Sequence, residues 1–112
     1  MTVTVANLII AKTAENAKTA QYTSDGAKTI IDKFTATNVG SVDVDFSVNL
    51  VPKSGAVGND NLILDARTIS PGETYQCGEL LAQVLEDGDF ISTLASVANI
   101  LTIKSSGRII TT

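Results

Sequence analysis

Strict alternation of apolar and polar residues marks the stretch from Val42 to Val51. Its apolar members are Val42, Val44, Phe46, Val48 and Leu50, and its polar members are Asp43, Asp45, Ser47 and Asn49. A period of two places successive side chains on opposite faces of a β-strand. One face of such a strand packs on a core while the other meets solvent, as in an antiparallel sheet. The stretch therefore predicts an antiparallel strand with one wet face.

Short segments of strand character recur along the rest of the chain. We expect strands over residues 3–12, 18–23, 27–38, 42–51, 61–69, 74–77, 90–96 and 99–105, followed by a short apolar tail. Residues suited to tight turns separate them, as in Ser24–Gly26, Ser70–Glu73 and Glu86–Asp89. The turn at Asn38–Ser41 predicts that the strands on either side of it form a hairpin.

Two segments depart from strand character. Pro52–Asn61 is polar and contains glycines, which predicts a loop. Gly78–Leu85 is the one helical candidate, because Leu80, Leu81, Val84 and Leu85 would form an apolar stripe about two turns long.

Strand spacing predicts an all-β protein. Eight or nine short strands with one short helix are typical of an antiparallel β-sandwich, and a jelly roll is the preferred topology. Strand number does not determine strand order, so an immunoglobulin-like Greek-key sandwich is the alternative. We expect residues 1–112 to form a single domain, in which residues 1–7 and 108–112 form either edge strands or short terminal arms.

Composition and charge narrow the classes of partner. The 112 residues are 44% apolar and 18% charged, which suits a protein with a core. Twelve acidic residues against eight basic ones give a net charge of −4, which disfavours direct contact with nucleic acid. The first residues lack a basic segment and a continuous apolar block, so we expect neither a signal peptide nor a membrane anchor.

Chemistry-bearing residues are sparse. Histidine is absent and Cys77 is the only cysteine, which excludes an internal disulfide and removes the usual general base. We interpret Cys77 as a small buried residue. Asp43 and Asp45 are interpreted as a solvated face, and the carboxylates of Glu86–Asp89 as a charged turn without calcium-loop spacing. We therefore expect no enzyme activity, no cofactor and no metal. The loop segment 55–61 remains a contact candidate because loops on a rigid scaffold often carry binding.

Strand-forming apolar residues lie at both termini: Val3, Val5, Leu8, Ile109 and Ile110. Ordinary edge strands of the sandwich explain them. The alternative interpretation is that one terminus adds a strand to a neighbouring subunit, with affinity supplied by main-chain hydrogen bonds. These five residues are the candidate interface.

Several turn motifs, in their order along the chain, resemble those of small virion proteins of tailed bacteriophages. They are the tyrosine-ended Lys18–Tyr22, the long strand Lys28–Asn38, the Pro-Gly-Glu-Thr turn in Ile69–Thr74, the segment Leu85–Thr93 and the Ser-Gly turn of Ser105–Gly107. The resemblance covers about residues 17–110. The motifs are structural turns, so they point to a family more than to a role.

The resemblance implies a non-enzymatic capsid cement or decoration protein on the virion exterior, made in the host bacterial cytoplasm. Its implied partners are the major capsid protein and copies of itself, in a homo-oligomer. The alternative is a neck, tail, baseplate or head-fibre component. A carbohydrate-binding adhesion module is a third interpretation, disfavoured because sugar sites need exposed aromatic rings and few aromatic residues are present.

Overall fold

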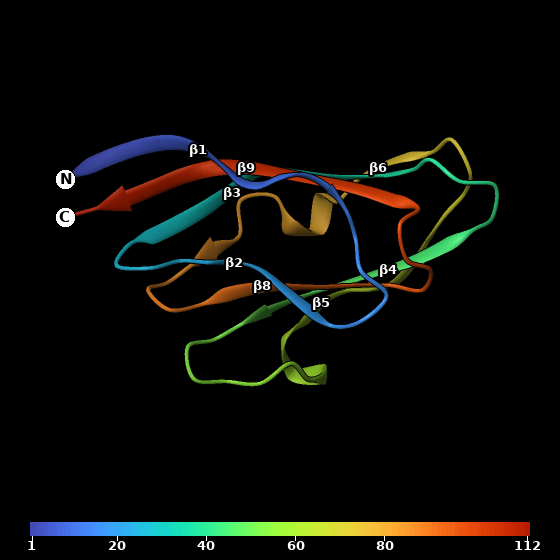
Figure 1. The fold of residues 1–112 in the computed structure, drawn as a ribbon. Coiled ribbons are helices and arrows are strands. Elements are labelled where there is room, and N and C mark those ends of the chain that lie inside the picture. Colours follow the sequence, from blue (N-terminus) through green and yellow to red (C-terminus); the bar gives the residue numbers. More distant parts are fainter.

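Two antiparallel sheets pack face to face in the computed structural model, which describes residues 1–112 (Figure 1). The strands are β1 (Thr2–Thr13), β2 (Thr19–Thr23), β3 (Lys28–Asn38), β4 (Val44–Val51), β5 (Leu62–Ile69), β6 (Thr74–Gln76), β7 (Val84–Leu85), β8 (Phe90–Ala95) and β9 (Leu101–Thr111). The two helical segments are single 3-10 turns, η1 (Asn59–Asn61) and η2 (Gly78–Leu80). No helix is long and apolar enough to cross a bilayer.

The order of strands identifies the topology as a jelly roll. One sheet runs β1-β9-β3-β6, with β7 also paired to β3, and the other runs β2-β8-β4-β5. The pairs β1·β9, β2·β8, β3·β6 and β4·β5 are those of one long hairpin closed between β4 and β5. Wrapping this hairpin adds the pairs β9·β3 and β8·β4 and divides the strands between two sheets. The predicted sandwich and its preferred topology are confirmed.

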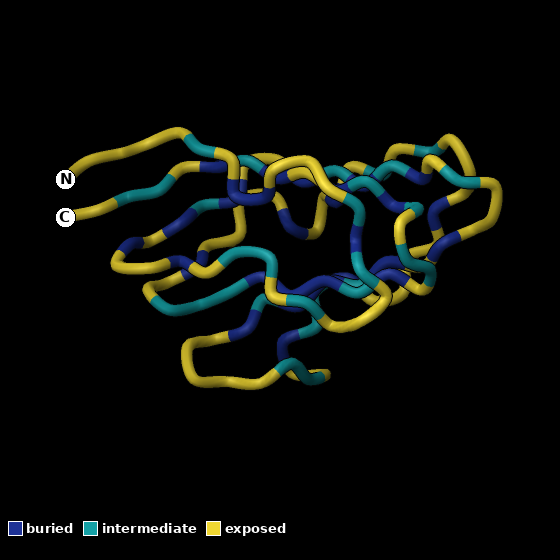
Figure 2. Tube along the Cα trace, viewed as in Figure 1, coloured by how far each residue is buried: buried dark blue, intermediate teal, exposed yellow.

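A single hydrophobic core lies between the sheets. The predicted alternation holds from Val44 to Val48, where Val44, Phe46 and Val48 are fully buried. It fails at both ends of the predicted stretch, because Val42 is exposed before β4 begins and a register shift after Val48 buries Asn49 and leaves Leu50 half-buried. Phe46 meets Phe34 of the opposite sheet with ring centroids 6.1 Å apart, so the two aromatic rings join the layers near the middle of the core. Figure 2 shows buried backbone along the facing sheets and exposed backbone at the turns and at both termini.

Hydroxyl groups close the core at the end nearest the termini. The Ser24 hydroxyl donates to the carbonyl of Ala27 at 2.6 Å and lies 2.9 Å from the Thr29 hydroxyl, which in turn lies 2.9 Å from that of Tyr22. Ser24 and Thr29 are fully buried and no buried side-chain polar atom lacks a partner. The apolar core therefore ends at a satisfied polar network.

The predicted hairpin across Asn38–Ser41 is wrong, because β3 and β4 lie in different sheets. The side chain of Asn38 explains why the chain passes from one sheet to the other after β3. Its side-chain amide donates to the carbonyls of Val42 and Ile69, and its side-chain carbonyl accepts from the Gly40 amide. These bonds hold the chain in a corner that leads from one layer to the other.

The predicted short helix over Gly78–Leu85 is also wrong. Only the turn η2 forms, and β7 follows it. Of the proposed stripe, Leu80 and Leu85 are buried, whereas Leu81 and Val84 are exposed. The main chain bonds β3 instead of itself, since the Ala82 amide donates to the carbonyl of Ile31 and the Ile31 amide donates to that of Gln83.

Strand β9 continues through the segment predicted to be a turn and a tail. Gly107 lies inside the strand, between Ala6 of β1 and Ile31 of β3. A Cβ atom at Gly107 would lie 2.1 Å from the carbonyl oxygen of Ile30. Gly107 is therefore required by close approach of neighbouring strands, and residues 108–111 are sheet, not a free arm.

Candidate interaction surface

The two ends of the chain form a projecting ribbon. Residues Thr2–Ala6 of β1 pair in order with Thr111–Gly107 of β9, and we call this pair of segments the terminal ribbon. Figure 1 shows that it reaches past the strands of the opposite sheet. The first residues of β1, from Thr2 to Val5, are exposed on both faces. The β1 half of the ribbon thus belongs to a sheet but not to the core, whereas Ile109 in its β9 half packs against the core.

Cross-strand register places a set of apolar side chains together on the outer face of the sheet. Val5 is opposite Arg108, which is opposite Ile30, which is opposite Val84. Opposite residues in an antiparallel sheet share a face, and the neighbours of Ile30 in β3 are buried, so this row points outward. In the next row, Val3 lies opposite Ile110. We call the resulting cluster the apolar patch; it consists of Val3, Val5, Ile30, Val84 and Ile110.

The structure separates the predicted interface residues. Val3 and Val5 are 50% and 80% exposed and share the apolar patch with the half-buried Ile110. Ile109 is opposite Thr4 on the other face of the ribbon. Leu8 is 5% exposed and packs in the core, so it has no free surface for a partner. The sequence missed Ile30 and Val84, because alternation assigns a face but not the neighbour in the next strand.

The charged groups on this face are paired within the molecule, including Arg108, which lies between Val5 and Ile30. Arg108 donates to both carboxylate oxygens of Asp32 at 2.8–3.2 Å. This contact lowers the pKa of Asp32 and raises that of Arg108. Lys28 lies 3.4 Å from Glu86. The patch therefore presents apolar surface with locally balanced charge.

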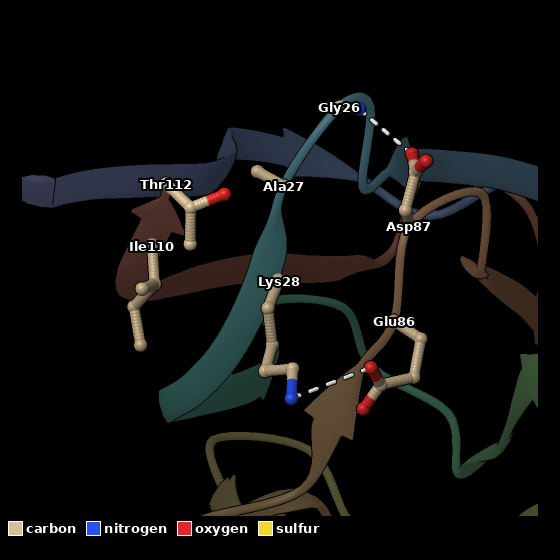
Figure 3. Close-up of a pocket in the computed structure, with 7 residues that line it drawn as sticks. All are labelled: Gly26, Ala27, Lys28, Glu86, Asp87, Ile110 and Thr112. Atoms are coloured by element: carbon tan, nitrogen blue, oxygen red, sulfur yellow. Dashed lines mark hydrogen bonds and ion pairs between the residues drawn. The ribbon is translucent and has the colours of Figure 1, made fainter. Parts of the chain in front are cut away.

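A shallow depression of about 410 Å³ adjoins the patch (Figure 3). It is lined by Gly26, Ala27, Lys28, Glu86, Asp87, Ile110 and Thr112. Its polar groups bond one another, since the Gly26 amide donates to Asp87 at 2.8 Å and Lys28 pairs with Glu86. The charged side chains of the depression thus already have partners within the protein.

A second open groove, of about 530 Å³, runs between β1 and β2 on the side of the sandwich that carries the β1 edge. Leu8, Ile9 and Ile10 line it, together with Ala20. The strand register shifts between Asn7 and Ile9, and so Leu8 and Ile9 are both buried. Ile10 is 75% exposed.

The carboxylates singled out in the sequence serve the main chain and neighbouring hydroxyls. Asp89 accepts from the amides of Lys53 and Glu86 at 3.0 and 2.9 Å, which holds the turn of Glu86–Asp89. Asp45 accepts from the Thr68 hydroxyl at 2.7 Å on an exposed sheet face, and Asp43 is exposed. Asp43 and Asp45 thus lie on the solvated face interpreted from the sequence, and Asp89 has the further role of holding the main chain of the charged turn.

The loop candidate is held by two buried asparagines. Asn49 donates to Asn61 at 2.8 Å and to the carbonyl of Gly58 at 3.0 Å, and Asn61 donates to that of Ala56 at 2.9 Å. The Gly58 and Ala56 carbonyls and the Asn61 side chain thus bond within the protein and hold segment 55–61 in its conformation.

Cys77 is fully buried, as interpreted from the sequence, and burial raises the pKa of its thiol to about 12. A thiol that stays protonated is a poor nucleophile.

Near Cys77, three side chains that the sequence did not connect join the two sheets. The Arg67 guanidinium of β5 lies 4.2 Å above the ring of Tyr75 in β6, and the Tyr75 hydroxyl donates to Glu79 at 2.5 Å. The bond to Glu79 raises the pKa of Tyr75 to about 12 and lowers that of Glu79. The β5 and β6 edges are therefore tied together across the open side of the sandwich.

No protein-family model, curated protein or solved structure matches this chain with significance.

Proposed function

We propose that this protein is a structural virion protein of a tailed bacteriophage, which binds the outer surface of the capsid as a cement or decoration protein. The observation that carries the proposal is the apolar patch of a small jelly roll, which extends from Val84 and Ile30 onto the projecting terminal ribbon. Val3 and Val5 expose apolar surface there, and the adjacent charges are neutralised by internal pairs. The turn motifs shared with small virion proteins supply the biological setting.

The apolar patch suits attachment to a folded protein surface. Burying apolar area contributes about 25 cal/mol per Å², and no charge in the patch would lose its partner on docking. Bound across a junction between capsomers, each copy adds buried area to both sides of the junction. Repetition over the lattice would then resist the outward pressure of packaged DNA.

Other features favour a binding role over catalysis or sugar recognition. The chain has no histidine, its only thiol is buried, and its turn carboxylates accept from main-chain amides. None of the five aromatic residues is exposed: Phe34 and Phe46 are buried, and Phe90, Tyr22 and Tyr75 are half-buried. A sugar would find no open ring on which to stack. The net charge of −4 disfavours a phosphate backbone as partner.

Copy number in separated virion parts tests the proposal. Heads and tails from virions of the phage that encodes this chain are analysed by quantitative mass spectrometry. We expect hundreds of copies in the head fraction. About a dozen copies or fewer in the tail fraction would instead assign the protein to the neck, baseplate, tail or a fibre, and absence from both fractions would overturn a virion role.

A variant pair tests the surface. Capsids lacking the protein are incubated with wild type, Val84→Lys or Val39→Lys, and bound protein is measured after sedimentation. Val84 lies in the apolar patch and is 44% exposed, whereas Val39 is 64% exposed in the corner after β3, away from β7. We expect Val84→Lys to lose binding and Val39→Lys, with the same change of charge, to retain it. Equal binding of both variants would exclude the patch as the contact.

A further inference from the structure

The outer edge of β1 is a free edge of its sheet. β1 pairs with β9 on one side only and is the terminal strand in the order β1-β9-β3-β6. The main-chain groups of alternate residues along such an edge point outward and have no partner in the sheet. In the terminal ribbon these groups lie at the projecting end of the molecule, so another strand can approach them without meeting the opposite sheet (Figure 1).

The two halves of this edge differ in how well they are protected against pairing with another strand. The later half carries Lys12, which donates to Glu15 and Gln21 at 2.9 Å, and Gln21 also bonds Glu15 at 2.9 Å. Lysine and irregular register are common devices that prevent edge-to-edge pairing. The half from Thr2 to Ala6 has no charged residue, no proline and an unbroken register with β9. Its edge is thus unprotected in a chain whose net charge would otherwise keep copies apart.

The segment Thr2–Ala6 is complementary to itself. Its midpoint is Thr4, and it precedes the irregularity that begins at Asn7. Two copies placed antiparallel about a two-fold axis through Thr4 would set Thr4 opposite Thr4 and Val3 opposite Val5. Threonine pairs and pairs of β-branched apolar residues are both favourable across strands, and no like charges meet. The axis keeps Val3 and Val5 of both copies on the outer face, because residues directly opposite share a face.

We propose that a second copy of this chain covers the edge, and that the protein dimerises by antiparallel pairing of Thr2–Ala6 in the two β1 strands. The two sheets join into one, and the two apolar patches become a single outer surface across the axis. The inference deepens the proposed function, on which the role of this doubled surface at the capsid rests. The pairing itself requires no capsid. The contact is small, so the dimer forms at high protein concentration.

The mass of the purified full chain in solution tests the pairing. Sedimentation analysis is carried out from micromolar to millimolar concentration on wild type, Thr4→Lys and Val84→Lys. Thr4 is exposed and points away from the apolar patch, so Thr4→Lys changes the edge and not the patch, and it sets two lysines opposite each other in the dimer. Val84→Lys adds the same charge to the patch, away from the edge. Circular dichroism verifies that each variant is folded.

We expect wild type and Val84→Lys to reach twice the chain mass of 11.7 kDa and Thr4→Lys to remain at that mass. As a second measurement, Thr4→Cys should oxidise to a disulfide-linked dimer, because opposite residues in an antiparallel pair lie within the range of Cα separations that a disulfide spans. Val39→Cys should not. A monomeric wild type, a trimer, or a dimer unaffected by Thr4→Lys would overturn the inference. Capsid binding is measured separately, so the test of dimerisation remains valid even if the protein does not bind capsids.

Discussion

Strand β4 and the first half of β1 carry the same alternating pattern, but the apolar residues of one are buried and those of the other are exposed. In β4, Val44, Phe46 and Val48 are fully buried between β8 and β5. In β1, Val3 and Val5 alternate with threonines in the same way, yet both are exposed. The difference lies in the face that these residues occupy, since Phe46 of β4 points at Phe34 of the opposite sheet while Val3 and Val5 point to the outer face of their own sheet. Alternation therefore reports strand formation, and burial depends on what lies opposite.

The largest expected effect tests this difference directly. Phe46→Ala should lower the free energy of unfolding by about 3–5 kcal/mol, because it removes a fully buried ring that contacts Phe34 of the other sheet. Val5→Ala should change it by no more than about 0.5 kcal/mol. Denaturant unfolding of both variants measures the contrast, and similar losses would show that Val5 also packs in the core.

The base of the terminal ribbon should be sensitive to added volume. Gly107→Ala should destabilise the protein by about 1–3 kcal/mol, because the new methyl group would collide with the carbonyl of Ile30. Gly78→Ala is the matched control, since a Cβ there meets no atom within 4 Å, and its effect should stay within about 0.5 kcal/mol. Thermal unfolding of the pair measures both effects. Equal stability would mean that β9 bends away at Gly107 and that the ribbon is not continuous with the sheet.

Removal of residues 1–6 should separate folding from association. Leu8 and Ile9, the first core residues of β1, remain, so we expect cooperative unfolding with a smaller loss of stability than that of Phe46→Ala. Dimerisation in solution and binding to capsids should both be lost. Heteronuclear NMR spectra with native dispersion, together with a monomer mass, would agree with this division. A collapsed spectrum would instead place the start of β1 in the folding unit.

The smallest expected effect concerns the β5 and β6 edges, which are joined by side-chain contacts, unlike the open β1 edge. Tyr75 has its pKa raised from 10.0 to about 12, so the folded state favours the protonated phenol. The stabilisation is therefore complete below pH 10 and is lost as the pH rises through about 12. Tyr75→Phe should reduce the alkaline dependence and leave the part that comes from the buried Cys77 thiol, whose pKa is also raised to about 12. Chemical denaturation at successive pH values measures the change, and Tyr22→Phe is the control. An unchanged dependence would show that the bond to Glu79 does not tie these edges.

Much of the fold followed from local chemistry. The turns at Ser24–Gly26, Ser70–Glu73 and Glu86–Asp89 form as predicted, each with a glycine at positive φ. The helix over Gly78–Leu85 was mispredicted because the leucine spacing fits a helical stripe as well as it fits the observed turn and strand. Main-chain hydrogen bonds to Ile31 keep the segment extended. The candidate interface was only partly predictable, since Leu8 and Val5 look alike in the sequence and differ only in which side of the bulge they occupy.

The sequence by itself determined that this chain is a β protein whose core requires no disulfide, because period-two alternation and turn residues act over a few neighbours. Tertiary structure alone decided which strands share a sheet, that Gly107 lies inside a strand, and that Ile30 and Val84 join Val3 and Val5 in one patch. These are relations between residues far apart in the chain. They depend on strand order and register, which arise when the whole hairpin wraps into two layers.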